Sequence, residues 1–582
     1  MAVSSDADER MKTLWTSAMA HLAESGRSTM KETKETRPTV IIRQGTLKGK
    51  VLSSTNHPVP IEAWLGVRYA KPPLGELRFA RPVALPPSDE IFDTVEWGHR
   101  CPGKQLITSF WTPKESEDCL TLNVFRKQGI TGGNRGKGLP VMLYLHGGAF
   151  NRGTACMHDD ASMLSWSERP YIAISCNYRI GALGFLNCSL TANEGVLNLG
   201  LHDQRLVLEW VQENVGAFGG DPANVTLVGL SAGAHSIGHH ITNINEKREL
   251  FQKAVIQSGG PTSRVVHPFD SALHEKQFRE FLEAVNCPKD LPERDIMSFL
   301  RKLPEATICN AQTRVFDTYN PSVRWAWQPV IDNEIISRRP LDAWKSGDWH
   351  KVPIITGFNH NEGSMYVPKA MATSKEFRTF FATLLPQLEP KDLDRLEELY
   401  PDPAKDPESP YTERRKEDLG PQYKRVEAAY GQYAYVAPVR QTAELAGSDK
   451  QQPPIYLYHW ASQSSVVNGA NHGDQLWYET MDEKVRDVSP SHDALARVFH
   501  DYICNFITSG NPNRLGDGAV KDLPAWKAFN GKDEAGKTMV FGDGNNERAG
   551  GKDAGIVAHL IKDPWAVQET DFWWQMGEKF ED

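Results

Sequence analysis

The stretch Val225-Thr-Leu-Val-Gly229-Leu-Ser231-Ala-Gly233-Ala-His-Ser-Ile-Gly238 joins a β-branched apolar run, a G-x-S-x-G turn and a segment of small residues. A strand-to-helix reversal this tight leaves no room for side chains at its flanks, which explains glycine at 229 and 233. The turn would hold the Ser231 oxygen above a sheet and aim the Ala232 amide at the same space. A bare G-x-S-x-G is often only a helix-capping turn, but this context favours a nucleophile elbow.

Apolar runs recur on both sides of the turn and alternate with helical patterns. Short runs without strict polar alternation are typical of strands buried on both faces of a mostly parallel sheet. The runs cover residues 140–145, 171–175, 225–228, 254–256, 352–356 and 455–458. Residues 202–217 have helical spacing, and Asp221-Pro222 then predicts a turn. The pattern predicts an α/β fold with a large central sheet flanked by helices, and with helical insertions at about 262–350 and 366–450 over its C-terminal edge.

Residues 1–37 are expected to form an amphipathic helix followed by a polar linker, ahead of a single domain over 38–582. The apolar residues of the helix recur every three or four positions: Met11, Leu14, Trp15, Ala18, Met19 and Leu22. Packing on the domain is favoured over membrane-surface binding, because the polar face of the helix carries both charge signs.

Composition and motif content limit the binding partners and the cellular compartment that we expect for this protein. The net charge is −9 with no basic block, so nucleic acid is not an expected partner, and no apolar run is long enough to span a bilayer. The N-terminus is acidic where a secretory signal would be basic, which predicts a cytoplasmic protein. The eight cysteines form no C-x-x-C pair and no zinc-like cluster with histidine, so no metal or cofactor is expected. Nothing in the sequence indicates the oligomeric state.

A serine nucleophile needs a base and an orienting acid, and in hydrolases with this elbow they follow in the order Ser, Asp/Glu, His. Glu362 and His472 lie in polar loops after predicted strands, in that order. By position alone Asp332 competes with Glu362, while His360 and His459 compete with His472.

A transition-state oxyanion needs backbone amides that are already in place. Gly147 and Gly148 follow the 140–145 run, where glycine lets the backbone approach a substrate oxygen. Together with Ala232 they are the predicted oxyanion donors.

Beyond these motifs, the chain resembles the type B carboxylesterases, the cholinesterase/lipase family of the α/β-hydrolase fold. The matching blocks cover residues 66–79, 116–123, 146–150, 177–185, 198–204, 218–222 and 257–259, within a resemblance over about residues 38–545. The resemblance implies a triad of Ser231, Glu362 in an N-x-x-E-G loop, and His472. It also implies a Cys101–Cys119 disulfide, with Cys287–Cys309 as a looser match to a second one.

Three positions depart from the family pattern. Leu230 replaces a frequent Glu before the serine, Gln475 replaces an acid after the histidine, and Asn333-Glu334 replaces Asp-Gly. None of them belongs to the triad, so we expect them to affect the choice of substrate and the cellular setting of the protein rather than the catalytic chemistry.

The resemblance implies a serine carboxylesterase in which Ser231 attacks an ester carbonyl, His472 takes its proton, and water later releases the acid. The alternatives are a lactonase or acyl-transfer enzyme with the same triad and, less favoured, a non-catalytic cholinesterase-like binding protein.

Aromatic residues near the motif positions are candidates to line the substrate pocket. For each of them, packing in the hydrophobic core is the alternative role. They are Phe110, Trp111, Phe150, Trp325, Trp327, Tyr366, Trp477 and Tyr478. Such a pocket would suit a bulky, largely apolar ester, either a xenobiotic in detoxification or a secondary metabolite, and could also hold a quaternary ammonium group.

Overall fold

The computed structural model describes residues 37–104, 111–132, 137–413, 419–447, 452–513, 524–529 and 537–580. The predicted N-terminal helix and Phe110 lie outside these residues.

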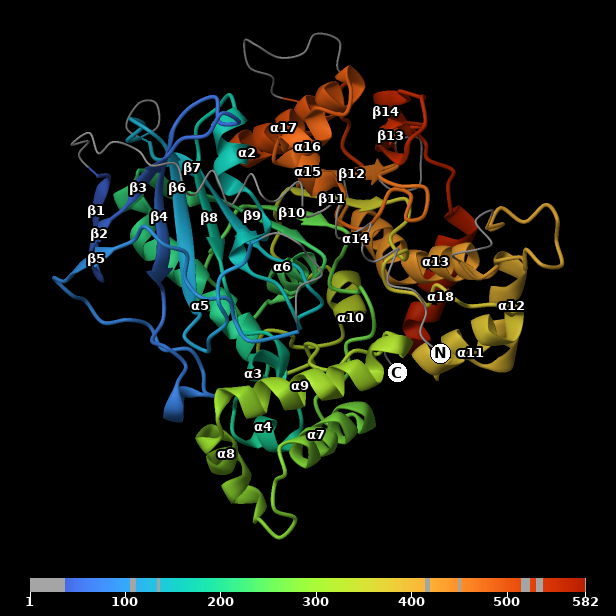
Figure 1. Cartoon of the computed structure of the whole chain (residues 1–582), viewed down its shortest axis with the longest axis horizontal. Coiled ribbons are helices and arrows are strands. Elements are labelled where there is room, and N and C mark those ends of the chain that lie inside the picture. The colour runs from blue at the N-terminus through green and yellow to red at the C-terminus, as the bar shows by residue number, and fades with distance from the viewer. Residues whose placement is uncertain are drawn as a thin grey trace.

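Eleven strands form the central sheet, in the order β14-β13-β12-β11-β10-β9-β7-β8-β6-β4-β3. Its middle strands run parallel: β7 (Leu139–Leu145), β8 (Ile172–Cys176), β9 (Gly220–Leu230), β10 (Lys253–Gln257), β11 (Ile354–Asn359), β12 (Ile455–Trp460) and β13 (Thr538–Asp543). Antiparallel strands complete both edges: β3 (Lys50–Leu52), β4 (Ile61–Arg68), β6 (Thr121–Lys127) and β14 (Ile556–Ile561). A small second sheet lies beside the β3–β4 edge (Figure 1) and contains β1 (Thr39–Ile42), β2 (Gly45–Lys48) and β5 (Ile91–Asp93).

Alternate residues of the middle strands enter two hydrophobic cores, one on each face of the sheet. Leu143, Leu227 and Ile256 pack with helices α5 (Leu199–Asn214), α6 (Ala232–Thr242) and α14 (Ala437–Gly447). Their neighbours Met142, Val228 and Val255 pack with α2 (Asp160–Trp166) and α17 (Pro490–Ser509). This two-faced burial explains the continuous apolar runs and confirms the predicted layered α/β fold.

The two helical insertions also have the predicted positions. The first follows β10 and contains α7 (Ala272–Ala284), α8 (Glu293–Lys302), α9 (Glu305–Tyr319) and α10 (Pro340–Lys345). The second follows β11 and contains α11 (Ser374–Leu384), α12 (Pro390–Leu399), α13 (Tyr423–Gly431) and the π-helix η6 (Gln432–Val436), which continues into α14. Figure 1 shows α7–α9 and α11–α12 as two separate groups away from the sheet.

The remaining helices and turns complete the described chain. The helices are α3 (Gly181–Phe185), α4 (Ser189–Asn193), α15 (Gln475–Glu479), α16 (Glu483–Arg486) and α18 (Val567–Phe580). The 3-10 turns are η1 (Gly75–Leu77), η3 (Ala155–Met157), η4 (Val215–Phe218), η5 (Asn320–Ser322) and η7 (Glu547–Ala549). Among the described helices, none has the length and apolar character needed to cross a bilayer.

The start of the elbow strand differs from the prediction. Asp221 and Pro222 belong to β9 rather than to a turn before it, because β9 already pairs with β7 at Gly220. The register between the two strands then shifts between Leu139 and Val141. An irregularity within the strand therefore accommodates the turn-forming residues.

One of the two cysteine pairings is present. Cys101 and Cys119 form a disulfide. The looser pairing of Cys287 with Cys309 is wrong, because both are free thiols. Cys287 lies just beyond the end of α7 with its sulfur 3.9 Å from the Pro288 carbonyl, whereas Cys309 on α9 lies beside Glu115.

Candidate active site

Ser231 lies at the junction of β9 and α6 with φ 57° and ψ −122°, a conformation that non-glycine residues rarely adopt. Its amide donates to the Gln257 carbonyl at 2.9 Å, which ties the turn to β10. A Cβ atom at Gly233 would lie 2.0 Å from the Leu145 carbonyl oxygen, and one at Gly229 would lie 2.8 Å from Gly233. The packing therefore requires both glycines, and the strained serine is the kind of outlier that marks functional sites.

The glycine loop after β7 packs directly against this elbow. A Cβ atom at Gly147 would lie 2.8 Å from the Leu230 carbonyl oxygen and 3.1 Å from Ser231 Cβ, and Gly148 has φ 115°. Within the described residues, the amides of Gly147, Gly148 and Ala232 donate no hydrogen bond. They are therefore available to a ligand oxygen beside Ser231.

The His146 ring holds this loop in place. Its Nδ1 is 2.8 Å from the Gly147 carbonyl oxygen, and the ring stacks on Tyr178 with centroids 4.3 Å apart. The Tyr178 hydroxyl in turn donates to the His146 carbonyl at 2.7 Å. Burial lowers the pKa of His146 to about 4, so at neutral pH the ring is an uncharged spacer.

Glu362 and His472 meet at the C-terminal ends of β11 and β12. Nδ1 of His472 donates to Oε2 of Glu362 at 2.5 Å, and Oε1 of Glu362 accepts from the Asn359 amide at 2.7 Å. Both side chains are buried. The bond to Glu362 places the lone pair of His472 on Nε2, which has no hydrogen-bond partner among the described residues. This is the arrangement of a base awaiting a proton.

The two loops are joined to each other and lie beside the elbow. The Asn361 amide donates to the Ala470 carbonyl at 2.9 Å, and Nδ2 of Asn359 donates to Oε1 of Gln475 at 2.8 Å. A Cβ atom at Gly473 would lie 3.1 Å from Cδ2 of Leu230. Two positions that depart from the family pattern, Gln475 and Leu230, thus support the loop that carries His472.

The rival residues lie elsewhere. Asp332 stabilises a turn, accepting from the amides of Glu334 and Ile336 at 2.9 Å each and from Asn198 at 2.7 Å. Nδ1 of His360 is 3.1 Å from Nε2 of His459, whose Nδ1 is 3.0 Å from Asp563. The structure pairs neither of these histidines with Glu362.

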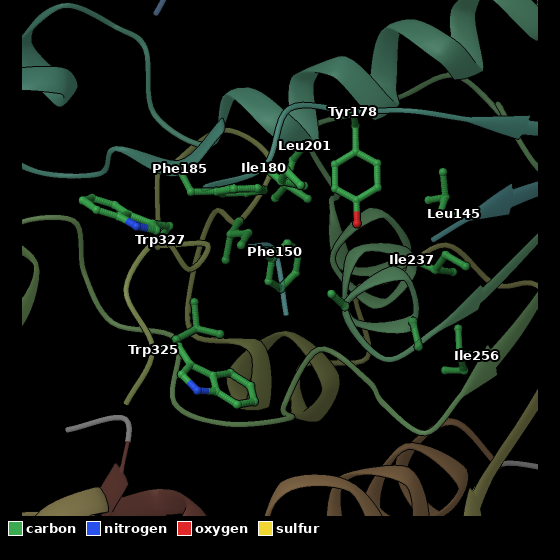
Figure 2. Close-up of a cluster of buried hydrophobic side chains, with 14 of the residues drawn as sticks. Leu145, Phe150, Tyr178, Ile180, Phe185, Leu201, Ile237, Ile256, Trp325 and Trp327 are labelled. Atoms are coloured by element: carbon green, nitrogen blue, oxygen red, sulfur yellow. The ribbon is translucent and has the colours of Figure 1, made fainter. Parts of the chain in front are cut away.

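Of the predicted aromatic residues, Tyr366 packs against His472, Trp325 packs against Tyr366, and Phe150 packs near the helix that follows the elbow. The Tyr366 ring is 5.4 Å from His472 and 5.4 Å from Trp325, and Phe150 is 6.3 Å from His235 in the first turn of α6. Figure 2 shows Phe150 close to α6, with the Trp325 indole set apart from the Ile180–Phe185 group.

Other predicted pocket residues do not approach His472. Trp327 is buried in the core, where Nε1 donates to the Gln312 carbonyl and the ring packs on Phe281. Trp477 and Tyr478 pack in the core on the α17 face of the sheet. Trp111 is 60% exposed. A large aromatic side chain fits a core as well as a pocket, and sequence spacing does not separate the two.

Tyr435 was not predicted, and its ring is the nearest aromatic neighbour of His472 among the described residues, at 4.6 Å. It lies on the π-helix η6, an element with no sequence motif, although π-helical segments often mark functional sites. In the described ranges, no group of three His, Cys, Asp or Glu side chains could hold a metal ion.

Comparison with known proteins gives consistent matches. A family model described as the carboxylesterase family matches residues 36–553. "Secreted lipase 4" of Gibberella zeae is 32% identical over 86% of this chain and 88% of its own. "Pyrethroid hydrolase Ces2a" of Mus musculus is 28% identical over 83% and 84% of the two chains. The crystal structure of EstA from Aspergillus niger superimposes with a TM-score of 0.77 at 24% identity, covering 94% of this chain and all of the other.

Proposed function

The chain belongs to the carboxylesterase family and is a carboxylic ester hydrolase of the α/β-hydrolase fold, and from this premise we propose that Ser231, His472 and Glu362 form its catalytic triad. The proposal rests on the 2.5 Å hydrogen bond between Glu362 and His472, in a loop whose Gly473 lies close to Leu230 of the serine elbow. A non-catalytic binding protein would have no need to keep all three groups in this arrangement.

The proposed reaction has two steps. Nε2 of His472 takes the Ser231 proton as the oxygen attacks the ester carbonyl, and the amides of Gly147, Gly148 and Ala232 stabilise the oxyanion. His472 then protonates the departing alcohol, which leaves an acyl-serine. Next, His472 removes a proton from water, whose attack releases the acid and restores Ser231. Glu362 holds the imidazole in the required tautomer and stabilises its charged form.

We propose a bulky ester with a largely apolar body as the substrate. The rings of Tyr366, Tyr435 and Trp325 form an aromatic wall beside His472, which supports a large apolar ligand. A lactone, or an acyl acceptor other than water, would use the same triad, so the choice depends on the substrates offered.

A fluorophosphonate probe tests the nucleophile. The wild-type protein and a Ser165→Ala control, altered at a buried serine on α2, should be labelled at Ser231, whereas Ser231→Ala should not. A p-nitrophenyl ester series from acetate to long acyl chains then measures the size of the acyl pocket. Failure of the folded wild-type protein to react with the probe would sink the proposal.

A further inference from the structure

We propose that Arg264 binds a negatively charged group of the substrate, so that the preferred ester carries a carboxylate in addition to the bond that is cleaved. This inference rests on the proposed function of Ser231 and His472 and adds a substrate class to it.

Arg264 lies in the loop that follows β10, the strand to which the serine elbow is tied through Gln257. Its backbone has φ 66°, in the left-handed region that favours glycine or asparagine. An arginine kept in this strained conformation indicates that its side chain has a task at this position.

The guanidinium of Arg264 is surrounded by aromatic rings. It lies 3.9 Å from the ring centroid of Trp325 and 5.6 Å from that of Tyr435, and Nη2 donates to the Tyr435 hydroxyl at 2.6 Å. Its Nε is buried and makes no hydrogen bond. Aromatic rings and the phenol oxygens of Tyr435 and Tyr430 satisfy only part of a group with five N–H donors.

Most other buried arginines of the described chain pair with a carboxylate. Arg78 pairs with Glu117, Arg179 with Asp203 and Arg440 with Asp563. Arg425 instead donates to oxygens of Tyr400, Ser374 and Gln422. No carboxylate among the described residues forms an ion pair with Arg264. Arg264 is half-buried as a residue, and an anionic group of a ligand would supply the missing acceptor.

A second arginine in the same region also lacks a carboxylate partner. Arg152, just after the glycine loop, lies 5.5 Å from the Phe316 ring, which stacks on Trp325 at 6.2 Å. It also has no ion pair in the part of the chain that the structure describes. Burial lowers the pKa of its guanidinium, while Tyr366 and Asp317 raise it to a smaller extent. Two cations without an ion pair among the described residues therefore lie against connected aromatic rings.

Arg264 and the proposed catalytic base contact the same group of aromatic rings. Tyr435 contacts both the guanidinium and the His472 ring, and Tyr366 connects Trp325 to His472. An anion on Arg264 would thus lie one aromatic ring away from His472. This geometry fits a half-ester of a dicarboxylic acid, or an ester of an alcohol that bears a carboxylate.

Two matched pairs of esters test the inference. The acid-side pair is p-nitrophenyl hydrogen glutarate and p-nitrophenyl pentanoate, and the alcohol-side pair is 4-carboxyphenyl acetate and 4-methylphenyl acetate. In at least one pair, Arg264→Met should lower the ratio of kcat/KM for the charged ester to that for the neutral ester by about 10-fold to 100-fold. The ratio for Arg264→Lys should lie between those of the wild-type protein and Arg264→Met, because lysine keeps the charge but lacks the planar guanidinium that can donate two parallel hydrogen bonds. The exposed Arg395→Met, remote in sequence from the site, should leave the ratio unchanged.

Binding without turnover gives a second readout. Glutarate should inhibit the wild-type protein competitively, with an inhibition constant at least 10-fold lower than for Arg264→Met or Arg152→Met. An Arg264→Met variant that retains the wild-type charged-to-neutral ratios in both pairs would overturn the inference. A second result would also overturn the inference: added inorganic phosphate raises the neutral-ester activity of the wild-type protein but not that of Arg264→Met. The anion bound by Arg264 would then be a free ion rather than a group of the substrate. In both cases fluorophosphonate labelling of Ser231 would persist, whereas its absence would refute the proposed function instead.

Discussion

Nδ1 of His472 donates a 2.5 Å hydrogen bond to Glu362, a residue 110 positions earlier in the chain. The bond exists because β11 and β12 are parallel neighbours, and a backbone hydrogen bond from Asn361 to Ala470 joins the loops that follow them. The tautomer of the histidine is thus set by sheet topology rather than by local sequence.

Glu362→Gln should therefore lower kcat by about 10³-fold to 10⁴-fold, because an amide cannot stabilise the imidazolium that forms during the reaction. Asp332→Asn is the matched control and should stay within a few-fold of wild type, since Asp332 bonds to turn amides and to Asn198 rather than to His472. Steady-state kinetics on one p-nitrophenyl ester measures both variants. The reverse pattern would identify Asp332 as the acid.

Gly147→Ala should lower kcat by about 10²-fold to 10³-fold, the usual effect of losing an oxyanion donor. The new methyl group would press on the Leu230 carbonyl oxygen and Ser231 Cβ and displace the loop that carries the amides. Gly216→Ala adds the same methyl group where nothing lies within 4 Å, so its kcat should match wild type. Equal activity of the two variants would mean that the loop does not contribute an oxyanion donor.

Glu427 should make the stability of the protein depend on pH. It is buried on α13, Asn361 donates to its Oε2, and its Oε1 has no partner in the described ranges. Burial raises the pKa of this carboxyl from 4.5 to about 7. The folded state therefore holds the proton more tightly than the unfolded state, and this stabilising contribution is lost as the pH rises from about 5 through 7.

Urea unfolding at pH 5 and pH 8 measures this contribution. Between the two values, the wild-type free energy of unfolding should fall relative to that of Glu427→Gln, by at most about 3 kcal/mol. The exposed Glu398→Gln should follow the wild-type curve. Parallel pH dependence of wild type and Glu427→Gln would show that Glu427 does not titrate in this range.

The Cys101–Cys119 bond should contribute about 3 kcal/mol to stability, the usual value for a loop of this size, here with a sequence separation of 18. Cys119→Ser and reduced wild type should melt at similarly lowered temperatures, whereas Cys287→Ser, at a free thiol, should melt like wild type. Thiol titration in denaturant without reductant counts the free cysteines, and a count of eight instead of six would show that the bond is absent.

The sequence predicted those parts of the site whose geometry is local. Gly229, Ser231 and Gly233 form one turn, so their spacing alone defines the elbow. The choice of Glu362 over Asp332 was different, because it depends on which strands become neighbours, and only the family resemblance indicated it. Tyr435 and Arg264 had no motif, since an insertion and an irregular loop bring them to the site. Cys287 and Cys309 show the opposite error. The family resemblance suggested that they pair, but the fold does not bring their sulfur atoms together.

The strand order also determines when the protein gains its proposed activity during folding. Gly147, Ser231, Glu362 and His472 follow four different strands, and each meets its partners only after chain segments of roughly a hundred residues have closed. Such non-local contacts form late and slowly. A nascent chain that has not yet added β12 has no base for its serine, so ester hydrolysis should return during refolding only after the helices have formed.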